Sequence, residues 1–420
     1  MKIAVIGGGA TGLAAAYFLA KKGAKVCLFE KNEVGGLMGT FRINSTYLEK
    51  YYHHFFKSDR ELIALANELG LNEKLYFKKV DMGFYHKNRL HRFSTPLDLL
   101  SFRPLRIIER IKTGLLLVYF QKTTKWKKFE KHLMHEWLAE KIGRNAFDVM
   151  WLPLMTAKFG NRYKEIPLSW FWGRIHPRAN SRSFSKEELG YIKGSCKTLT
   201  DRLQEEIKKM GAVIIKKEVK SVSKSLDVYA GKKYSFDKVL VTTPTPAFTK
   251  IANLPKEYAD KLGKISYQGI VCMALKLKKP LSGFYWLNIS DPEIAFGGVI
   301  EHTNFIPKEA YGASVAYLFN YAQKNSRIYR MSRKQLFRLY MKGLKKIYSS
   351  FNEKDVESYT ISRDEYATPV YTKDYLQIMP PHTTPIKNLY LANTAQIYPE
   401  DRNINNSIKT AKKAAAIMLN

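Results

Sequence analysis

The hydrophobic pattern divides the first thirty residues into three short segments. Residues 2–6 (KIAVI) are a lysine followed by four apolar residues, which is typical of a short buried strand. Residues 13–23 (LAAAYFLAKKG) predict a helix that ends at Gly23, and residues 25–30 (KVCLFE) predict a second strand that ends at Glu30. Strand, helix and strand at this spacing predict a parallel βαβ unit.

The rest of the chain has a mixed pattern. Residues 85–188 are helix-rich and aromatic, whereas residues 262–355 combine strand-like runs at 269–277 and 284–289 with a helical pattern at 332–351. Short strand-like runs separated by turn residues occupy 212–246. Near the end, a strand is expected at 388–394 and a helix at 403–419. We find no internal repeat and no low-complexity tract, so a mixed α/β protein is expected.

Charge adds a second constraint. Of 420 residues, 70 are Lys or Arg and 37 are Asp or Glu, which gives a formal net charge of +33. Such an excess predicts attraction to polyanions, either nucleic acid, anionic lipid headgroups or phosphorylated substrates. No zinc-finger, basic-zipper or RNA-binding signature accompanies the charge, so we expect no nucleic-acid partner. The oligomeric state has no signature in the sequence.

The chain is expected to be cytoplasmic. Its three cysteines are far apart, which fits a reducing compartment without disulfides or thiolate metal sites. Glycines interrupt the apolar N-terminal run and no cleavage pattern follows, so we expect no signal peptide. No stretch approaches the roughly 20 apolar residues of a spanning helix, which leaves contact with a membrane surface as an alternative to a fully soluble state.

The first turn predicts a dinucleotide site. Gly7, Gly9 and Gly12 stand in G-x-G-x-x-G register between the first strand and the helix. Such glycines allow a tight turn, close approach of backbone N–H groups to a pyrophosphate, and close packing of helix on strand. The helix N-terminus adds a positive dipole end for the phosphates. Glu30, 18 positions after Gly12, can accept hydrogen bonds from the hydroxyls of an adenosine ribose.

A second glycine-rich turn follows directly, with Gly35, Gly36 and Gly39 in EKNEVGGLMGT. It resembles the extended fingerprint of FAD-containing amine oxidases, protoporphyrinogen oxidases, phytoene desaturases and UDP-galactopyranose mutases. Many of those proteins carry Arg after the paired glycines, where this chain has Leu37. The resemblance implies FAD as the cofactor, although the contact made by that Arg in relatives is absent here.

The resemblance extends over most of the chain. Residues 151–175, 190–203 and 388–415 are similar to the middle and C-terminal blocks of bacterial protoporphyrinogen-oxidase-like proteins. It implies an α/β fold: a Rossmann-like FAD-binding domain of the GR2 type with an interleaved α+β substrate domain. The FAD-binding domain is then expected at 1–84, 189–261 and 356–420, and the substrate domain at 85–188 and 262–355.

The same resemblance implies roles for single residues. Val219 matches the position that meets adenine, Asp401 the acid that binds the ribityl chain, and the following helix start faces the flavin pyrimidine ring. A helix dipole at that edge stabilises the negative charge of a reduced flavin. The expected cofactor-binding residues are Gly7, Gly9, Ala10, Thr11, Gly12, Glu30, Lys31, Gly35, Gly36, Leu37, Met38, His54, Val219, Thr243, Asp401, Asn406 and Ile408.

Two adjacent histidines lie within the aromatic stretch YYHHFF. The stretch resembles the part of UDP-galactopyranose mutases where a histidine contacts the flavin, and His54 is the better match. An imidazole there could orient the ring, donate to its carbonyl edge or relay a proton. A buried aromatic without a chemical role is the alternative for His54. We expect no metal site, because no other His or Cys cluster has ligand spacing.

Residues 103–131 combine charge with an apolar run. They hold nine Lys or Arg and two Glu around LLLVYF, and Trp126 and Phe129 follow. This composition suits a segment that lies at the headgroup layer of an anionic membrane. Resembling proteins that oxidise porphyrinogens or carotenoids dock on membranes through their helical domain. The alternative is a helix pair that buries LLLVYF in its own core.

Substrate-side chemistry is expected at Lys158 and Arg174, with Trp170 and Trp172 beside them. An Arg among aromatic side chains can bind a carboxylate or phosphate while the rings cover an apolar or sugar face. A structural Arg in an ordinary aromatic cluster is the alternative. With His54, these two residues are the catalytic candidates.

The function implied is an FAD-dependent oxidoreductase that transfers a hydride between flavin N5 and a hydrophobic or lipid-linked substrate. It would be cytoplasmic and peripheral on the inner face of the membrane. One alternative is a non-redox flavoenzyme resembling UDP-galactopyranose mutase, which acts on a nucleotide sugar. Another is a flavin-stabilised membrane scaffold without turnover.

Overall fold

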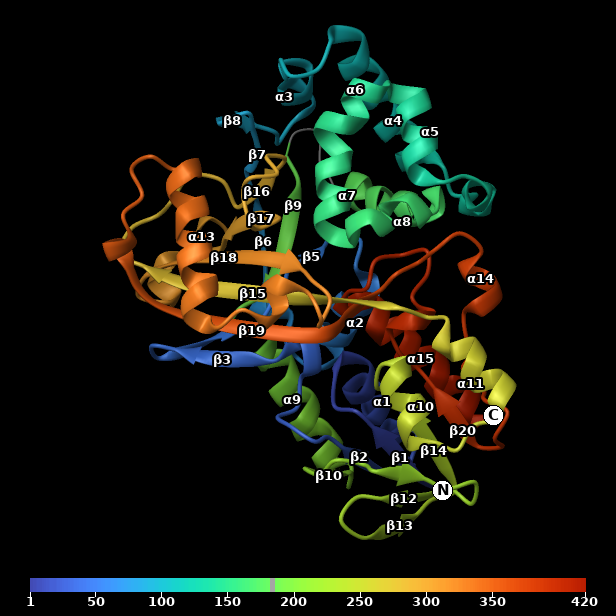
Figure 1. Cartoon of the computed structure of the whole chain (residues 1–420). Coiled ribbons are helices and arrows are strands. Elements are labelled where there is room, and N and C mark those ends of the chain that lie inside the picture. Colours follow the sequence, from blue (N-terminus) through green and yellow to red (C-terminus); the bar gives the residue numbers. More distant parts are fainter. Residues whose placement is uncertain (182–185) are drawn as a thin grey trace.

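The structure is a computed structural model that describes residues 1–181 and 186–420. Figure 1 shows a parallel sheet with its helices at the lower end, a larger sheet at the left, and a group of helices at the top. Residues 182–185, which belong to the expected substrate segment 85–188, lie outside the described residues.

A five-stranded parallel sheet combines apolar runs at the two chain ends with two strands from residues 212–246. Its order is β10-β2-β1-β14-β20, which confirms the strands expected at 2–6, 25–30 and 388–394. The strands are β1 (Lys2–Ile6), β2 (Lys25–Phe29), β10 (Val213–Ile215), β14 (Lys238–Val241) and β20 (Leu389–Leu391). Because parallel strands run in one direction, their carboxyl ends share one edge of the sheet, where ligands bind in this class of fold.

Both faces of this sheet are covered, which explains why residues 3–6 of the first strand are all apolar and buried. Ile3 and Val5 pack with three helices on one face, whereas Ala4 and Ile6 pack in a second core that includes a small β-meander. The helices are α1 (Ala10–Lys21), α9 (Cys196–Lys209) and α15 (Ile404–Leu419), and the meander is β11 (Ser221–Val222), β12 (Asp227–Tyr229) and β13 (Lys233–Ser235).

A seven-stranded mixed sheet has the order β19-β15-β18-β17-β16-β7-β8. Along β15, Val271, Met273 and Leu275 pack with α13 (Arg333–Ile347), and the alternate residues face the opposite core. This period of two is typical of a sheet with two different faces. The strands are β7 (Met82–His86), β8 (Arg89–Arg92), β15 (Tyr267–Leu277), β16 (Trp286–Ile289), β17 (Gly298–Glu301), β18 (Ser314–Tyr321) and β19 (Val356–Pro369).

Shorter elements connect these layers. A hairpin and a three-stranded sheet lie next to the large sheet, and short helices link the strands. The strands are β3 (Thr40–Ile43), β4 (Thr46–Glu49), β5 (Phe55–Phe56), β6 (Leu75–Lys79) and β9 (Glu188–Ile192). The helices are α2 (Arg60–Glu68), α10 (Thr245–Ile251), α11 (Lys256–Gly263), α12 (Arg327–Arg330) and α14 (Tyr375–Ile378).

Helices form the upper layer in Figure 1. They are α3 (Pro96–Leu100), α4 (Ile107–Lys122), α5 (Met134–Ile142), α6 (Arg144–Ala146), α7 (Leu152–Phe159) and α8 (Leu168–Asn180). Phe120 of α4 packs against Trp137 of α5 and Phe171 of α8, at ring-centroid distances of 5.8 and 5.7 Å. Among the described residues, no helix combines the length and apolar character needed to cross a membrane.

The apolar run LLLVYF is divided between two surfaces of α4. Leu116 and Phe120 are 7% and 0% exposed inside the helical layer. Leu115 and Val118 are 65% and 53% exposed. The run is therefore neither wholly a core segment nor wholly a surface segment, because a helix turns its successive residues to different sides.

Strand pairing bears on where the two expected domains divide. β7 pairs with β16, and β19 pairs with β15 along most of its length. Residues 82–84 and 356–369 therefore belong to the seven-stranded sheet, although the sequence grouped them with the FAD-binding segments. We propose the division of domains with these two stretches assigned to the substrate side.

Candidate cofactor and substrate site

The turn between β1 and α1 has room for glycine alone at two positions. Gly7 has φ = +108°, a conformation that L side chains rarely adopt. A Cβ on Gly12 would lie 1.8 Å from the carbonyl oxygen of Gly7. No atom lies within 4 Å of the place where Gly9 would carry a Cβ. With Ala10 and Thr11, these residues form the start of α1, whose free N–H groups suit a pyrophosphate.

Glu30, directly after β2, anchors the same turn. Its Oε2 accepts a hydrogen bond from the N–H of Gly8 at 2.8 Å, and its Oε1 accepts one from the N–H of Asn32 at 2.9 Å. Each carboxylate oxygen has a second lone pair, so Glu30 can also accept from two ribose hydroxyls. Lys31 is exposed beside it.

The second glycine turn lies against the first. A parallel bridge joins Gly9 and Gly35, and a Cβ on Gly36 would lie 3.1 Å from the Cα of Gly9. Gly35 and Gly36 have φ = +134° and +55°. Leu37 is half-buried in the short turn that follows, whereas Met38 is buried in the core with α1. The main chains of the first and second glycine turns therefore lie close together, and the two turns together can enclose an extended nucleotide.

The start of α15 is organised by asparagines. Asn403 caps the helix by accepting from the N–H of Asn406 at 2.8 Å, and Asn406 Nδ2 donates to the carbonyl oxygen of Asp401 at 2.9 Å. Ile408, one turn later, is 1% exposed in the core shared with α1. Its side chain therefore belongs to that core, which leaves only its main chain for contact with a cofactor.

A buried hydroxyl next to the glycine turn tests whether these residues fit FAD. Thr243 follows β14, and its Cγ2 is 3.3 Å from the Cβ position of Gly7. Its Oγ1 is buried and finds no hydrogen-bond partner among the described residues. Such an atom usually has a partner, which a bound dinucleotide would supply. Val219 is 7% exposed in the core formed with the meander. The glycine cradle and the orphaned hydroxyl together fit FAD.

His53 and His54 are both half-buried. His54 Nδ1 is 3.0 Å from Tyr285 Oη, and its ring lies edge-on to Trp286. His53 Nδ1 is 2.6 Å from the carbonyl oxygen of Tyr51, so this nitrogen carries the proton. Desolvation lowers the pKa of His54 to about 3 and that of His53 to about 4. Both rings are therefore neutral at pH 7.

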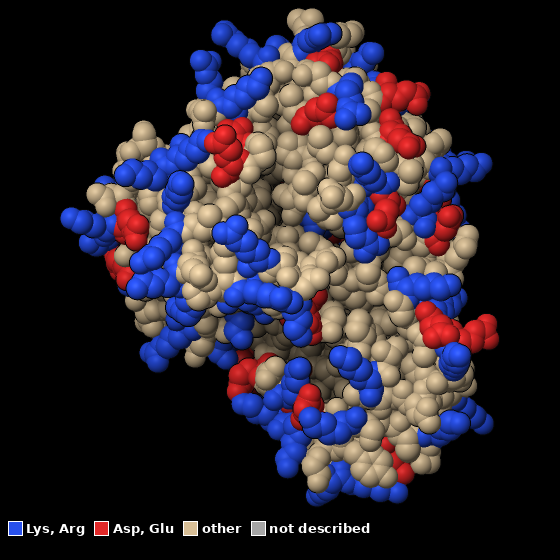
Figure 2. All heavy atoms as spheres, viewed as in Figure 1, with Lys and Arg blue, Asp and Glu red and all other residues tan. Residues whose placement is uncertain are grey.

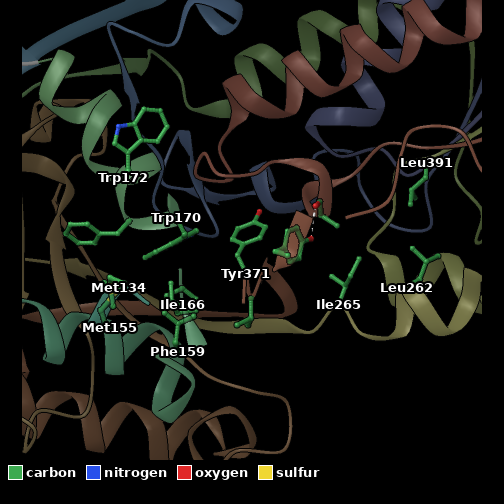
Figure 3. Close-up of a cluster of buried hydrophobic side chains, with 14 of the residues drawn as sticks. Met134, Met155, Phe159, Ile166, Trp170, Trp172, Leu262, Ile265, Tyr371 and Leu391 are labelled. Carbon is green, nitrogen blue, oxygen red and sulfur yellow. Dashed lines mark hydrogen bonds between the residues drawn. The ribbon is translucent and has the colours of Figure 1, made fainter. Parts of the chain in front are cut away.

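An ion cluster lies between α7, α8 and the segment before α15. Lys158 is 6% exposed, and its Nζ is 3.7 Å from Asp401 Oδ1, while Arg174 hydrogen-bonds the other carboxylate oxygen. Trp170 lies against both cations, with ring-centroid distances of 4.9 Å to Lys158 Nζ and 5.3 Å to Arg174 Cζ. Figure 3 shows Trp170 in the adjoining hydrophobic cluster, where it packs on Phe159 at 4.9 Å.

More basic than acidic groups meet here. Arg402 is half-buried beside Asp401, and its Nη2 is 3.5 Å from Tyr321 Oη. Its Nε has no hydrogen-bond partner among the described residues. Burial raises the pKa of Asp401, but Arg174, Lys158 and Arg402 outweigh it and hold that pKa well below its usual range. Burial, followed by the charge of Arg174, lowers the pKa of Lys158 well below its usual value.

The sequence predicted Trp172 beside Lys158 and Arg174, but the structure places it elsewhere on α8. Its Nε1 donates to the carbonyl oxygen of Thr123 at 2.9 Å, and its ring stacks on His176 at 4.7 Å. Trp172 therefore ties α8 to the segment after α4. Trp170 and Arg174 stay together because they stand four positions apart on one face of α8.

Sequence reasoning missed three residues of the site. Arg178 stands one helical turn after Arg174, and its Cζ is 5.9 Å from the ring of Trp286. That i, i+4 spacing was visible in WFWGRIHPR. Arg402 adjoins Asp401 and could have been found beside it. Tyr321 comes from the end of β18, and no local signal connects it to the other residues.

Comparison with known sequences identifies one family. Residues 10–419 match the family described as flavin containing amine oxidoreductase. 15-cis-phytoene desaturase of Narcissus pseudonarcissus is 32% identical over 96 residues, which are 22% of this chain and 17% of that protein. The matching part is thus about a sixth of the length of that curated relative.

Solved structures share the fold. A protein from Exiguobacterium sp. 255-15, whose proposed activity is protoporphyrinogen oxidase, has a TM-score of 0.80 at 18% identity over 100% of this chain and 98% of its own. Reduced UDP-galactopyranose mutase has a TM-score of 0.78 at 15% identity over 100% of this chain and 95% of its own. Identities this low establish a common fold and leave the reaction open.

The family match covers nearly the whole chain and includes Gly12, Glu30, the second glycine turn and the α15 segment. It confirms the expected Rossmann-like α/β fold class and the expected FAD cofactor. The chain therefore belongs to the family of flavin containing amine oxidoreductases.

Proposed function

We propose that the chain is an FAD-dependent oxidoreductase acting on a hydrophobic or lipid-linked substrate that carries an anionic group. It would be cytoplasmic and work on the inner face of a membrane. The bound flavin would supply hydride transfer at N5. The observation that carries the proposal is the cluster of Lys158, Arg174 and Arg402 around the single carboxylate of Asp401, against the indole of Trp170.

The cluster supports an anionic group on the substrate. Arg174 and Arg402 exceed Asp401 by one positive charge even when Lys158 is neutral. Even a partly buried surplus of charge is costly unless a ligand of opposite sign compensates it. A phosphate or carboxylate would do so, because the planar guanidinium groups can bind either one in a bidentate manner.

The aromatic surroundings support an apolar body next to that group. Trp170 lies under Lys158 and Arg174, and the ring centroid of Tyr321 is 5.3 Å from Lys158 Nζ. The rings of Trp286 and His54 meet edge-on, with their centroids 5.9 Å apart. Such rings exclude water and present apolar faces, while their polar edges stay hydrogen-bonded. An apolar chain or ring system joined to an acidic group fits both parts of the site.

A nucleotide sugar is the second candidate substrate, with chemistry like that of UDP-galactopyranose mutase. His54 lies beside Arg178 and Trp286, and paired arginines also suit a diphosphate. The two candidates differ in what happens to the flavin over one turnover. An oxidoreductase leaves it reduced when no acceptor is present, whereas a mutase returns it to its starting state.

The experiment that separates them uses the flavin-loaded protein without oxygen. Lipid extract or a UDP-sugar is added, flavin absorbance is followed, and products are identified by mass. Lasting bleaching with an oxidised lipid product supports the proposal. A mass-neutral sugar isomer formed only by reduced protein supports the mutase candidate. If neither the lipid extract nor the UDP-sugar is converted, the result would contradict the proposal and favour a flavin-stabilised scaffold without turnover.

Glu30→Ala is expected to weaken FAD binding while the fold is kept. The substitution removes charge-assisted hydrogen bonds to the ribose worth on the order of 1.5–3 kcal/mol each. It also removes the acceptor of the Gly8 N–H, so the glycine turn loses an anchor. The measurement is the dissociation constant of FAD for apoprotein, with chromatography of the released cofactor as the check of identity. Release of FMN, or an unchanged affinity in Glu30→Ala, would contradict the assignment.

His54→Ala is expected to shift the flavin absorbance envelope and reduction potential, whereas His53→Ala shifts them less. Because both rings are neutral at pH 7, each substitution removes a neutral aromatic group of the same size. The matched pair therefore separates contact with the flavin from loss of packing. Equal and negligible shifts in both variants would assign His54 to core packing.

A further inference from the structure

One side of the α3–α4 pair is both exposed and apolar. We call it the α3–α4 face. Its residues and exposed fractions are Leu97 (74%), Leu100 (48%), Ile107 (70%), Ile108 (53%), Ile111 (45%), Leu115 (65%), Val118 (53%) and Tyr119 (41%). α3 packs on α4, since the Cβ position of Gly114 is 3.8 Å from Leu99 Cδ2. Eight large apolar side chains on two packed helices form a patch, which marks an interaction site on a globular protein.

Helix geometry shows that the patch is a continuous stripe. At 100° per residue, the six α4 members fall within a sector of about 120°. The opposite side of α4 is buried through Thr113, Leu116 and Phe120. A surface helix normally has one apolar face directed to the core and a polar face directed to water. α4 instead has an apolar face on each side, so the outer one requires a partner.

The border of the face is basic. Arg103, Arg106, Lys112 and Lys122 are exposed around it, and Figure 2 shows Lys and Arg over the end of the molecule where Figure 1 places these helices. Both acids of residues 103–131 are engaged by neighbours. Glu109 is 7% exposed and accepts from the N–H of Arg106 and from Asn145, and Glu130 accepts from Tyr398 Oη.

We propose that the α3–α4 face is the part of the protein that enters the headgroup layer of an anionic lipid bilayer. The inference rests on the proposed membrane association and names the surface that performs it. Apolar side chains with a Lys and Arg border match the apolar and anionic layers of a membrane interface. A second copy of the chain fits less well, because two basic borders would be brought together.

The surface differs from the one that composition suggested. Phe129 is 2% exposed, and Trp126 is half-buried with its ring 5.9 Å from that of Tyr398. Neither is free to insert into lipid. The contact is instead made by outward residues of α4 that alternate with buried residues of the same apolar run, and by α3, which precedes residues 103–131.

The test is co-sedimentation of flavin-loaded protein with vesicles of phosphatidylglycerol and phosphatidylcholine, at low and high salt. Ile111→Asp combined with Leu115→Asp is expected to lower the partition coefficient by about tenfold per residue. The loss should persist at high salt, because burial of apolar groups is not screened. Val213→Asp combined with Tyr229→Asp is the control, since it makes the same charge change at exposed apolar residues of the other domain.

The outcomes distinguish failure of the α3–α4 face as the lipid contact from failure of the proposed membrane association. If the α4 variant binds vesicles more weakly and the control variant does not, while bound FAD and melting temperature are retained, the α3–α4 face is supported as the lipid contact. If wild type and both variants bind vesicles equally, the α3–α4 face is not the lipid contact, although the protein still associates with membranes. No binding of wild type at low salt overturns membrane association itself. A wild-type dimer that the α4 variant dissociates, without vesicle binding, would assign the face to a second copy.

Discussion

Gly12→Ala is expected to yield a protein that retains no FAD and unfolds at a lower temperature than wild type. The new Cβ would lie 1.8 Å from the carbonyl oxygen of Gly7 and 2.8 Å from Thr242 Oγ1, so α1 must move away from β1. Overpacking of this kind costs about 3 kcal/mol or more in the free energy of unfolding. The displaced helix would also carry its N–H groups away from the pyrophosphate. Flavin absorbance per mole of purified protein and a thermal melt measure both effects.

Gly263→Ala is the matched control. Gly263 ends α11, and no atom lies within 4 Å of its Cβ position. Alanine is therefore expected to be neutral or slightly stabilising there. A Gly12→Ala protein with a full complement of FAD would show that α1 tolerates the shift, and would contradict the close helix–strand packing on which the site depends.

Lys158→Met is expected to keep FAD and gain stability near neutral pH, but to lose about 100-fold in kcat/KM on its substrate. Lys158 is buried at 6% exposure, and methionine fills a similar volume without a charge to desolvate. Asp401 keeps Arg174 as its partner, so no carboxylate is left unpaired. The reduction potential of the flavin should fall by roughly 30 mV if the lysine helps to hold negative charge there.

The pH dependence of stability gives a second measurement on the same cluster. Lys158 has a folded pKa below its unfolded value of about 10.4, so the folded state binds fewer protons between the two values. Wild-type stability therefore rises with pH in that window, and Lys158→Met should lose the rise. Asp401 has a folded pKa below its unfolded value of about 3.9. Its contribution is present above pH 3.9 and is lost as the pH falls toward the folded pKa.

Lys164→Met serves as the control for Lys158→Met, because Lys164 is exposed on the turn that follows α7. It should change neither turnover, reduction potential nor the pH dependence of stability. Wild-type turnover in Lys158→Met would remove Lys158 from the substrate site. A loss of FAD in that variant would instead place the lysine at the cofactor.

The dinucleotide cradle could be predicted because its determinants are close together in the chain. Gly7, Gly12 and Glu30 lie in one βαβ unit, where backbone geometry and strand length place them without help from distant residues. The same holds for Trp170 and Arg174, which one turn of α8 brings together. Local spacing is sufficient when a single helix or turn sets the geometry.

The outcome for LLLVYF shows where local spacing fails. Its composition suited a membrane surface and a buried helix equally well. The structure divides it between the two, because α5 and α8 cover one side of α4 and, among the described residues, nothing covers the other. Which side of an apolar helix is covered depends on the helices packed against it.

The sequence by itself determined the family and the cofactor, and it predicted the glycine cradle, since glycines at fixed offsets and a terminal acid act through local backbone geometry. Only the tertiary structure brought together the residues of the proposed substrate side. Lys158, Asp401 and Tyr321 come from α7, the segment before α15 and β18, and meet because the helical layer and the large sheet close around the end of the first sheet. Contacts between elements this far apart depend on packing of whole layers, which no spacing within the chain encodes.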